Sequence, residues 1–416
     1  MEQSVTVPTK RILLSAYSCE PGKGSEPGVG WNTALQLARR HEVWVMTRAN
    51  NRRRIEEALA DLPQTNLTFV YCDLPAWARW WKKGGRGVQL YYLLWQVAAY
   101  RLARRTHTKV GFQVVHHVTF GKYWGPTLMT GLGIPFLWGP IGGGESCRPV
   151  FWTGGGVRPV AFEGIRAVAR WIGERNLFVR RAARQARAIL VPTPDTERRL
   201  LRMGARNIVR FPGQTGMSAD EIQRLASLPD PDGSKCRFLT IGRLEHWKGV
   251  HLAIRAFAQA DIRESSYVIV GDGPQREFLE GLVATLGVSD RVQILGQLPR
   301  SRTFDQLGES HVLVHPSLHD FFPTVCLEGM AAGKPVICLD IGGPAVQVDD
   351  ATGIRIPAVS PDQVIRDLAG AMKQLASNPE LRDAMGDAGQ LRVRRHFDWD
   401  RQAVALYDIY DGIQNQ

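Results

Sequence analysis

Two carboxylates, Asp320 and Glu328, lie eight residues apart in a stretch whose character changes between them. Asp320 precedes the turn-forming sequence Phe-Phe-Pro, whereas Glu328 opens the helix-forming sequence Glu-Gly-Met-Ala-Ala-Gly. We therefore expect Asp320 in a loop and Glu328 about one turn into a helix. Carboxylates held in this way accept hydrogen bonds from vicinal hydroxyl groups, so the spacing predicts a site for a sugar or a ribose. The alternative is that Asp320 only caps the following helix.

Two cations follow a predicted strand at 236–242. Arg243 comes directly after this strand, and Lys248 lies five residues further on, where we expect a helix to open. Cations at the mouth of a strand–loop–helix unit neutralise a diphosphate, including the charge that develops on a leaving oxygen. The alternative is that both residues are solvated charges at an ordinary helix start.

Glycine-rich turns follow two of the predicted strands. The turn at 18–31 contains Gly22, Gly24, Gly28 and Gly30. Backbone without side chains at a helix N-terminus favours an anion, but the spacing matches neither G-x-G-x-x-G nor a P-loop, so a plain structural turn is the alternative. Gly271 belongs to a second turn at 271–274, which either keeps side chains out of a ligand site or is an ordinary strand–helix turn.

Three further residues are candidates for acid–base chemistry. His116 and His117 end a predicted strand, whose alternation directs the two side chains to opposite faces. Either of them, or neither, is expected to reach a substrate. Glu145, in the sequence Gly-Gly-Gly-Glu, is expected to position or deprotonate a hydroxyl group, or else to be an ordinary loop carboxylate.

The elements that must position these residues form a repeating pattern. Short apolar runs alternate with helical patterns, for example a strand at 11–17 followed by a helix at 28–40, and the pattern restarts at 236–242. This alternation predicts an α/β protein with parallel sheets. The turn-rich segment 230–236 marks a boundary, so we expect two Rossmann-like, doubly wound domains that face each other across a cleft.

Charge is distributed unevenly along the 416 residues. Residues 1–215 hold 32 basic and 13 acidic residues, a balance of +19, whereas the remainder holds 20 and 27, a balance of −7. Between Leu74 and Gly144 there are nine basic residues and no acidic one, interspersed with Trp77, Trp80, Trp81, Tyr91, Tyr92 and Trp95. This mixture favours an anionic membrane surface as a partner. Nucleic acid is not expected, because no reader motif accompanies the charge, and a solvated Arg-rich surface is the alternative.

The sequence disfavours a membrane-spanning protein, a secreted protein, a zinc protein and a disulfide-bonded protein. No stretch approaches eighteen uncharged apolar residues, and the first residues lack the apolar core of a signal peptide. The six cysteines show no C-x-x-C spacing, which indicates neither a zinc site nor a disulfide framework. We expect a cytoplasmic protein that lies peripherally on the inner face of the cell membrane.

The second half of the chain resembles the C-terminal domain of retaining GT-B glycosyltransferases of family 4. The resemblance rests on G-R-L-x-x-x-K-G at 242–249, V-G-D-G-P at 270–274, the Asp320-to-Glu328 element and G-x-P-V-I at 333–337. The glycine-rich first loop, VVHHV and WGPIGGGE extend it over nearly the whole chain. It implies an acceptor-binding domain at 1–215, a nucleotide-sugar-binding domain at 216–395, and a helix at 396–416 that packs back on the first domain.

The resemblance also implies roles for individual residues. Glu328 would bind the ribose, Asp320 the donor sugar, and Arg243 with Lys248 the diphosphate as it leaves. Asp320, Arg243, Lys248 and one of the two histidines, His116 in preference to His117, are the implied catalytic residues. The implied donor-binding residues are Gly28, Gly30, Gly242, Arg243, Lys248, Gly271, Leu298, Asp320, Phe322, Thr324, Val325 and Glu328. Leu298 would lie near the base and Glu145 on the acceptor side.

The implied reaction is transfer of a sugar from a nucleotide-diphosphate sugar to a hydroxyl of a glycan or lipid-linked acceptor, in cell-surface polysaccharide assembly. No metal or other cofactor is expected. Two departures from the family pattern matter, because Asp320 replaces the usual Glu and Phe321 the usual Gly. They leave open a catalytically decayed nucleotide-sugar-binding subunit. A nucleotide-sugar epimerase of the same fold is a separate alternative.

Overall fold

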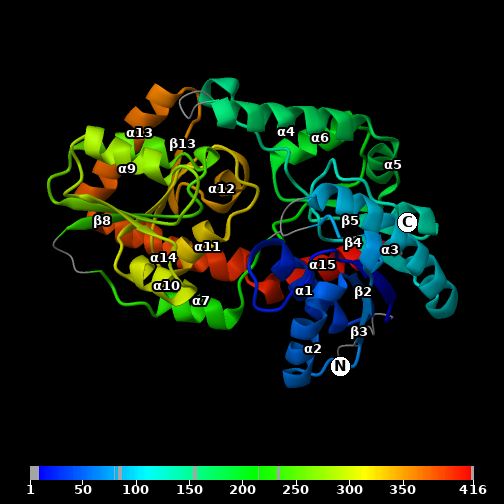
Figure 1. Cartoon of the computed structure of the whole chain (residues 1–416). Helices are drawn as coiled ribbons and strands as arrows, with labels where there is room; N and C mark the ends of the chain where they lie inside the picture. Colours follow the sequence, from blue (N-terminus) through cyan, green and yellow to red (C-terminus); the bar gives the residue numbers. More distant parts are fainter. Residues whose placement is uncertain are drawn as a thin grey trace. The chain divides into compact units, whose positions relative to one another are not determined.

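The computed structural model describes residues 9–413, apart from 79, 83–86, 153–156, 214 and 232–234. The chain forms two compact units (Figure 1). The first unit comprises 1–144, 168–216 and 399–416, and the second comprises 145–167 and 217–398. The segment 145–167, which we expected in the first domain, therefore belongs to the second unit.

The first unit, over its described residues, contains a seven-stranded parallel sheet in the order β3-β2-β1-β4-β5-β6-β7. In β1, Ile12 and Leu14 pack into one apolar core and Leu13 into another, so both faces of the sheet need a cover of helices. The strands are β1 (Arg11–Ser15), β2 (Glu42–Thr47), β3 (Leu67–Tyr71), β4 (Val114–His117), β5 (Phe136–Trp138), β6 (Ala188–Val191) and β7 (Ile208–Arg210). The helices are α1 (Ser25–Ala38), α2 (Arg52–Asp61), α3 (Val88–Val110), α5 (Leu177–Gln185), α6 (Pro194–Arg202) and α15 (Trp399–Gly412), with α4 (Val157–Arg175) shared between the units.

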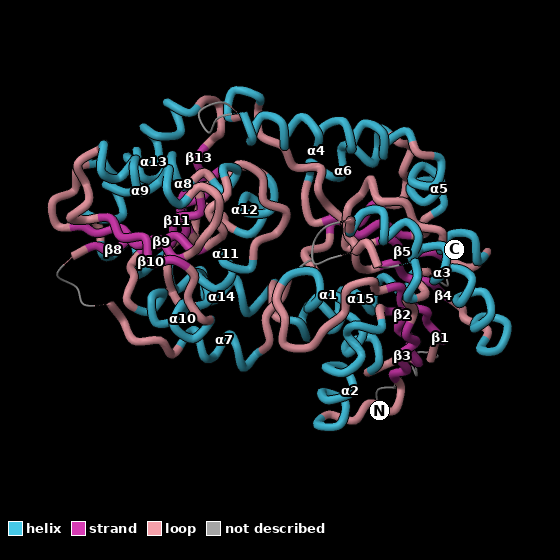
Figure 2. The backbone as a smooth tube through the Cα atoms, in the orientation of Figure 1, coloured by secondary structure: helices cyan, strands magenta, loops and turns pink. Residues whose placement is uncertain are grey.

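The described part of the second unit contains a six-stranded parallel sheet in the order β10-β9-β8-β11-β12-β13. Its strands are β8 (Cys236–Ile241), β9 (Ser265–Val270), β10 (Val292–Gly296), β11 (Val312–His315), β12 (Val336–Leu339) and β13 (Gly353–Ile356). Its helices are α7 (Ala219–Ala226), α8 (Val250–Ala260), α9 (Arg276–Thr285), α10 (Arg300–Gly308), α11 (Thr324–Ala331), α12 (Gly342–Gln347), α13 (Pro361–Ser377) and α14 (Pro379–His396). Helices α8, α9 and α13 cover one face of the sheet and α7, α10 and α14 the other (Figure 2).

Both units are doubly wound, as the sequence predicted. The strand order reverses once in each sheet, between β1 and β4 in the first unit and between β8 and β11 in the second. Helix α15 packs against α1 within the first unit. The helix expected at 28–40 begins earlier, at Ser25. None of the helices in the described ranges has the length and hydropathy that crossing a membrane requires.

Candidate active site

The loops after β8 and β11 meet where the strand order of the second unit reverses. In open α/β sheets this point leaves a crevice at the carboxyl edge in which ligands bind. Lys248 follows β8, and its ammonium group forms an ion pair with the carboxylate of Asp320, which follows β11. His315, the last residue of β11, has its Nε2 3.0 Å from Oδ2 of Asp320. Two residues that the sequence assigned to one site are therefore in direct contact.

The electrostatics of this cluster keep Asp320 ionised. The side chains of Lys248 and Asp320 are only 16% and 14% exposed. Burial acts to raise the pKa of Asp320, but the charge of Lys248 and the hydrogen bond from His315 outweigh it and hold the pKa well below its usual range. Burial lowers the pKa of His315 against the opposing influence of Asp320, so the ring is neutral near pH 7. Because a carboxylate only accepts hydrogen bonds, neutral His315 donates its Nε2–H to Asp320.

Backbone and ring contacts fix these two loops to each other. The Leu318 N–H donates to the carbonyl of Trp247 at 2.8 Å, and the Trp247 and His319 rings stack with centroids 4.8 Å apart. Gly249 has a φ of +67°, and a Cβ there would lie 2.0 Å from the carbonyl oxygen of Pro316. Glycine alone permits this approach, which seats the start of α8 on the β11 loop.

Arg243 occupies a more open position than Lys248. Its side chain is 75% exposed, and its Nη2 lies 3.0 Å from Oε1 of Glu245. An exposed guanidinium group is accessible to an anion that arrives from solvent. The role of Arg243 in holding a diphosphate stays a prediction.

Gly242 and Gly271 bring two loops back to back. The Gly242 N–H donates to the carbonyl of Val270 at 3.0 Å, and the Leu244 N–H donates to that of Asp272 at 2.9 Å. Gly271 has a φ of +151°, and a Cβ there would lie 1.8 Å from the carbonyl oxygen of Gly242. The structure therefore gives Gly271 a packing role, and its contact with a donor stays a prediction.

Glu328 lies inside α11, as its spacing from Asp320 predicted. Its Oε1 is 2.9 Å from Nη2 of Arg300, which also forms an ion pair with Glu221. Burial raises the pKa of Glu328, and the Arg300 charge only partly opposes this rise. Arg300 is a site residue that the sequence analysis missed. Its signal was an arginine two positions after Leu298, at the end of the loop that follows β10.

Four further predicted donor-binding residues lie in α11 or pack near it. Phe322 is buried in the apolar core of the second unit, and Val325 and Leu298 pack partly buried against that core. Thr324 is the first residue of α11. The side chain of Phe322 is committed to packing, so contacts with a ligand at this position are left to the backbone.

Helix α12 supports the Asp320 loop from the other side. The Gly343 N–H donates to the carbonyl oxygen of Asp320 at 2.9 Å. A Cβ on Gly342, whose φ is +61°, would lie 2.5 Å from the same oxygen. A Cβ on Gly343 would lie 2.1 Å from the carbonyl oxygen of Phe321. The paired glycines thus allow the Asp320–Phe321 backbone to lie directly on the start of α12.

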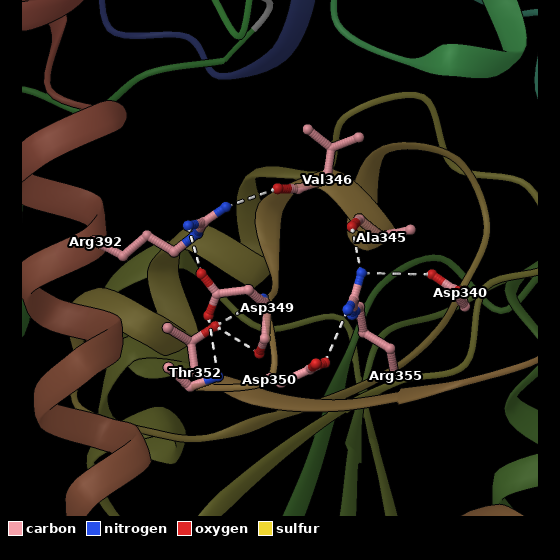
Figure 3. Close-up of polar contacts among 9 residues, drawn as sticks. Asp340, Ala345, Val346, Asp349, Asp350, Thr352, Arg355 and Arg392 are labelled. Atoms are coloured by element: carbon pink, nitrogen blue, oxygen red, sulfur yellow. Dashed lines mark hydrogen bonds and ion pairs between the residues drawn. The ribbon is translucent and has the colours of Figure 1, made fainter.

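Two arginines fix the turn that follows α12 (Figure 3). Nη1 of Arg392, from α14, lies 2.6 Å from Oδ2 of Asp349, and its Nη2 donates to the carbonyl of Val346 at 3.0 Å. Nη2 of Arg355 lies 2.8 Å from Oδ1 of Asp350. Nε of Arg392 also donates to the carbonyl of Gln347 at 2.7 Å, so Arg392 satisfies two carbonyl groups in the last turn of α12 and holds the end of this helix that is remote from Asp320.

Glu145 belongs to the second unit rather than to the first. It is 1% exposed, and a Cβ on Gly342 would lie 2.8 Å from its Cγ. Nη2 of Arg166 donates to its carbonyl oxygen at 2.8 Å. The structure therefore places Glu145 beside α12 and the Asp320 loop. Its predicted contact with an acceptor stays a prediction.

His116 and His117 are core residues of the first unit, with relative exposures of 0% and 1%. Nε2 of His116 lies 2.7 Å from the carbonyl oxygen of Gly139, and its Nδ1 lies 2.8 Å from the hydroxyl of Tyr410. Both ring nitrogens of His117 lie 3.1 Å from hydroxyl groups, those of Ser15 and Tyr92. Burial lowers the pKa of His116 to about 4 and that of His117 to about 3.

Each ring nitrogen of these two histidines therefore already has a partner within the first unit. These contacts hold both side chains inside the first unit. A contact of either ring with a substrate stays a prediction.

Gly28 and Gly30 lie within α1 rather than in front of it. A Cβ on Gly28 would lie 2.1 Å from the carbonyl oxygen of Lys23, and a Cβ on Gly30 would lie 2.3 Å from that of Ser18. Both glycines let the loop that follows β1 fold back against the helix. This packing explains their presence, and a contact with donor phosphates stays a prediction.

A polar cluster that the sequence analysis missed lies at the carboxyl ends of β2 and β3. Nε of Arg48 is 3.4 Å from Oδ1 of Asp73, and the hydroxyl of Tyr91 also donates to that oxygen. The Arg48 guanidinium lies 4.9 Å from the centre of the Tyr91 ring and 5.2 Å from that of Tyr17. The signal was a charged residue shortly after each of two predicted strands. Over the described residues, no group of three or more His, Cys, Asp or Glu side chains is placed to hold a metal ion.

The second unit matches a known family. Residues 229–392 match the family model described as glycosyl transferases group 1. This range contains Arg243, Lys248, Asp320 and Glu328, so the cluster described above lies inside the matched region. The predicted resemblance is therefore confirmed for this part of the chain.

Relatives and solved structures agree with this assignment. The chain is 31% identical over 231 residues to an alpha-D-kanosaminyltransferase of Streptomyces kanamyceticus, covering 53% of this chain and 57% of the relative. It is 33% identical over 173 residues to the lipopolysaccharide core biosynthesis glycosyltransferase LpsD of Rhizobium meliloti, covering 41% and 48%. The chain thus spans about half the length of the curated relatives that it matches.

The fold is shared over nearly the full length with Anabaena Alr3699/HepE, whose crystal structure contains UDP. The TM-score is 0.61 at 16% identity, over 97% of this chain and 100% of the other. At this identity the likeness shows the fold alone, and the predicted GT-B fold is confirmed.

Proposed function

We propose that this protein is a retaining glycosyltransferase that moves a sugar from a nucleotide-diphosphate sugar to a hydroxyl group of an acceptor. The observation that carries the proposal is the contact between Lys248 and Asp320 at the strand-order reversal of a group 1 glycosyltransferase domain. The pair supplies a cation for a departing diphosphate and an ionised carboxylate for sugar hydroxyls. Two relatives of the chain are named a kanosaminyltransferase and a glycosyltransferase, and a protein of the same fold was crystallised with UDP.

In this proposal the donor diphosphate lies against Lys248 and Arg243, and its ribose lies against Glu328. The two cations stabilise negative charge as the bond between the anomeric carbon and the diphosphate oxygen breaks. The acceptor oxygen bonds to the same face of the anomeric carbon, and its proton passes to the departing diphosphate. Configuration is therefore retained. The reaction needs no metal ion or other cofactor, because the arginine and lysine neutralise the leaving group.

The acceptor that we propose is a glycan or a lipid-linked glycan used in cell-surface polysaccharide assembly. Support comes from the printed name of one relative, a lipopolysaccharide core biosynthesis enzyme. The Arg48–Asp73 cluster adds hydrogen-bonding groups at the carboxyl edge of the first sheet, as an acceptor-binding unit requires. The acidic partner of this pair makes nucleic acid a poor ligand for the cluster.

We propose further that the protein is cytoplasmic and docks peripherally on an anionic membrane surface. Trp77 and Trp80 are 78% and 76% exposed, as this role requires. Three aromatic residues that we expected at the membrane surface are instead buried in the first unit. They are Tyr91, Tyr92 and Trp95. Their inclusion was wrong, because they form the inward face of α3. The basic residues Lys83 and Arg86 lie outside the described residues.

Helix α4 offers the larger apolar surface for such docking. Its exposed residues follow helical spacing and are Ile165, Val168, Trp171 and Ile172, each more than half exposed. Arg175 lies 3.9 Å above the Trp171 ring, an arrangement suited to the headgroup region. Trp171→Asp should weaken binding to vesicles of anionic lipid by about tenfold or more. Leu201→Asp, on α6, is the control, and undiminished vesicle binding of the Trp171 variant would contradict docking through α4.

The decisive test of the enzymatic proposal is donor binding. The purified protein is heated with sugars of UDP, GDP, ADP and dTDP in the absence of added metal. We expect one nucleotide to raise the melting temperature, and Glu328→Gln to reduce this rise because it weakens acceptance of ribose hydroxyls. Glu277→Gln, at an exposed position of α9, is the matched control.

The remaining outcomes separate the alternatives. No stabilisation by any nucleotide sugar contradicts the donor site. Conversion of a bound donor to its epimer without an acceptor favours an epimerase, and donor binding without turnover on any glycan favours a decayed subunit. An inverted anomeric configuration in the product would refute retention.

A further inference from the structure

A pocket of about 590 Å³ lies in the second unit next to the Lys248–Asp320 pair. Trp247, which directly precedes Lys248, and Leu318, two residues before Asp320, line it. The opposite wall comes from described residues of the ranges 147–152 and 157–163. The volume is within the range of roughly 300–1,000 Å³ that small-molecule sites occupy. The donor-binding roles discussed above leave this space unused.

The apolar part of the pocket wall is aromatic. Phe151, Trp152 and Phe162 all line it, and they come from the segment 145–167. Phe162 remains 54% exposed, although large apolar side chains gain free energy when they are covered. An aromatic wall of this kind suits a flat ligand with an apolar face, such as the C–H face of a pyranose ring.

The polar part of the wall contains hydrogen-bond acceptors that lack a partner. The acceptors Nδ1 of His246 and Oε1 of Gln275 are buried without a hydrogen-bond partner, and so is the donor Nε1 of Trp152. Nε2 of His246 lies 3.3 Å from the carbonyl oxygen of Phe151 and must donate to it, so Nδ1 carries the free lone pair. His246 is only 7% exposed, and a buried polar atom without a partner is costly. Such atoms call for a ligand that both donates and accepts hydrogen bonds, as hydroxyl groups do.

The charged groups at the pocket point to the same kind of ligand. Glu163 and Glu245 line it, while the described lining residues include neither lysine nor arginine. His319 and Arg166 fix the Glu163 carboxylate at 2.6 Å and 3.4 Å. Carboxylates repel phosphates and fatty-acid headgroups but accept hydrogen bonds from hydroxyl groups. Arg243 and Arg166 pair with these carboxylates from outside the described lining, and the carboxylate oxygens can still accept hydrogen bonds from hydroxyl groups.

We propose that this pocket binds a neutral sugar ring of the acceptor glycan, at a position beyond the hydroxyl group that receives the transferred sugar. The ring's C–H face packs on the aromatic wall, and its hydroxyls donate to His246, Gln275 and the two carboxylates. This assignment rests on the proposed glycosyltransferase function. It makes the segment 145–167 a determinant of acceptor choice carried by the same unit as the donor-binding residues.

The test uses the full chain and three neutral disaccharides, cellobiose, lactose and maltose, at up to roughly 20 mM, since single subsites bind with millimolar constants. Binding is followed by saturation-transfer difference NMR. We expect at least one disaccharide to bind, and Phe162→Ala and Gln275→Met to weaken that binding about tenfold or more. Phe278→Ala, an equally drastic change at a half-exposed position of α9, should leave it unchanged.

Three results would overturn the assignment. They are failure of all three disaccharides to bind, binding that neither pocket variant weakens, and preferential binding of a simple alkyl chain such as decanoate. Nucleotide-sugar stabilisation is measured on the same preparations. Stabilisation without disaccharide binding removes the pocket proposal alone, whereas loss of stabilisation by every nucleotide sugar removes the proposed function.

Discussion

The two strand-order reversals of this molecule place histidines at matching positions with different surroundings. His116 and His117 end β4 beside β1, and His315 ends β11 beside β8. All three rings are buried, and burial lowers the pKa of each. The neighbours differ, because His315 lies beside the ionised Asp320, whereas the other two contact only neutral groups.

This difference shows that a histidine's position in the fold does not determine its role. In the second unit the histidine supports a carboxylate that also contacts Lys248, so charge is concentrated at the loop ends. In the first unit the two rings connect strands and helices and leave no charge at the reversal point. We therefore expect the first reversal point to contribute rigidity and the second to carry the proposed chemistry.

The strongest test of this contrast is Lys248→Ala. Removal of the cation should lower turnover by roughly 100- to 1,000-fold, because one preorganised group that stabilises developing charge is lost. Asp320 also loses its ion pair, so its pKa should rise toward the ordinary range. The measurement is kcat on the folded fraction together with the free energy of unfolding.

Two further variants show whether a fall in turnover reflects the lost charge or a loss of folded protein. Lys248→Arg keeps the charge and should recover part of the turnover, while Lys373→Ala, exposed on α13, should change neither quantity. A fall in turnover no larger than the fall in folded fraction would make the second reversal point structural like the first.

Much of the fold follows from the sequence because buried parallel strands are continuous apolar runs. The placement of 145–167 does not follow in this way. This segment joins the second unit through contacts such as Glu163 with His319 and the carbonyl of Phe151 with His246. The first pair is separated by 156 residues along the chain, and local patterns carry no information about such partners.

The site could be predicted from the sequence where local structure determines the position of a residue. The loop position of Asp320 and the helical position of Glu328 followed from local helix propensity. The partner of Glu328, Arg300, was missed because their contact depends on how α10 and α11 lie side by side. The burial of Tyr91, Tyr92 and Trp95 was readable, since these residues share one face of α3 at helical spacing.

The second prediction has a smaller expected effect and concerns stability. Burial of His116 should make the free energy of unfolding fall at low pH. His116 has a pKa of about 4 in the folded protein and about 6.5 in the unfolded chain. Between these values the unfolded chain binds a proton that the folded protein does not, so falling pH favours unfolding. From pH 7 to pH 4.5 this group should remove about 2–3 kcal/mol from the free energy of unfolding.

His116→Gln tests this expectation, because glutamine keeps hydrogen-bonding groups but does not titrate. Chemical denaturation at both pH values should show a smaller loss of stability in the variant than in the natural protein. His396→Gln, at an exposed position of α14, is the control. Equal losses in the His116 variant and the natural protein would mean that this ring is not a source of the pH dependence.

The smallest expected effect comes from Tyr410→Phe, which removes one oxygen from the first unit. Since Nε2–H of His116 donates to the Gly139 carbonyl, its Nδ1 accepts from the Tyr410 hydroxyl at 2.8 Å. Loss of that donor should lower the free energy of unfolding by about 1–2 kcal/mol and leave turnover unchanged. Tyr100→Phe, which removes a hydrogen bond at an exposed site, is the matched control and should cost less. If Tyr410→Phe instead lowered turnover tenfold at constant stability, His116 would belong to the active site and the contrast between the two reversal points would fail.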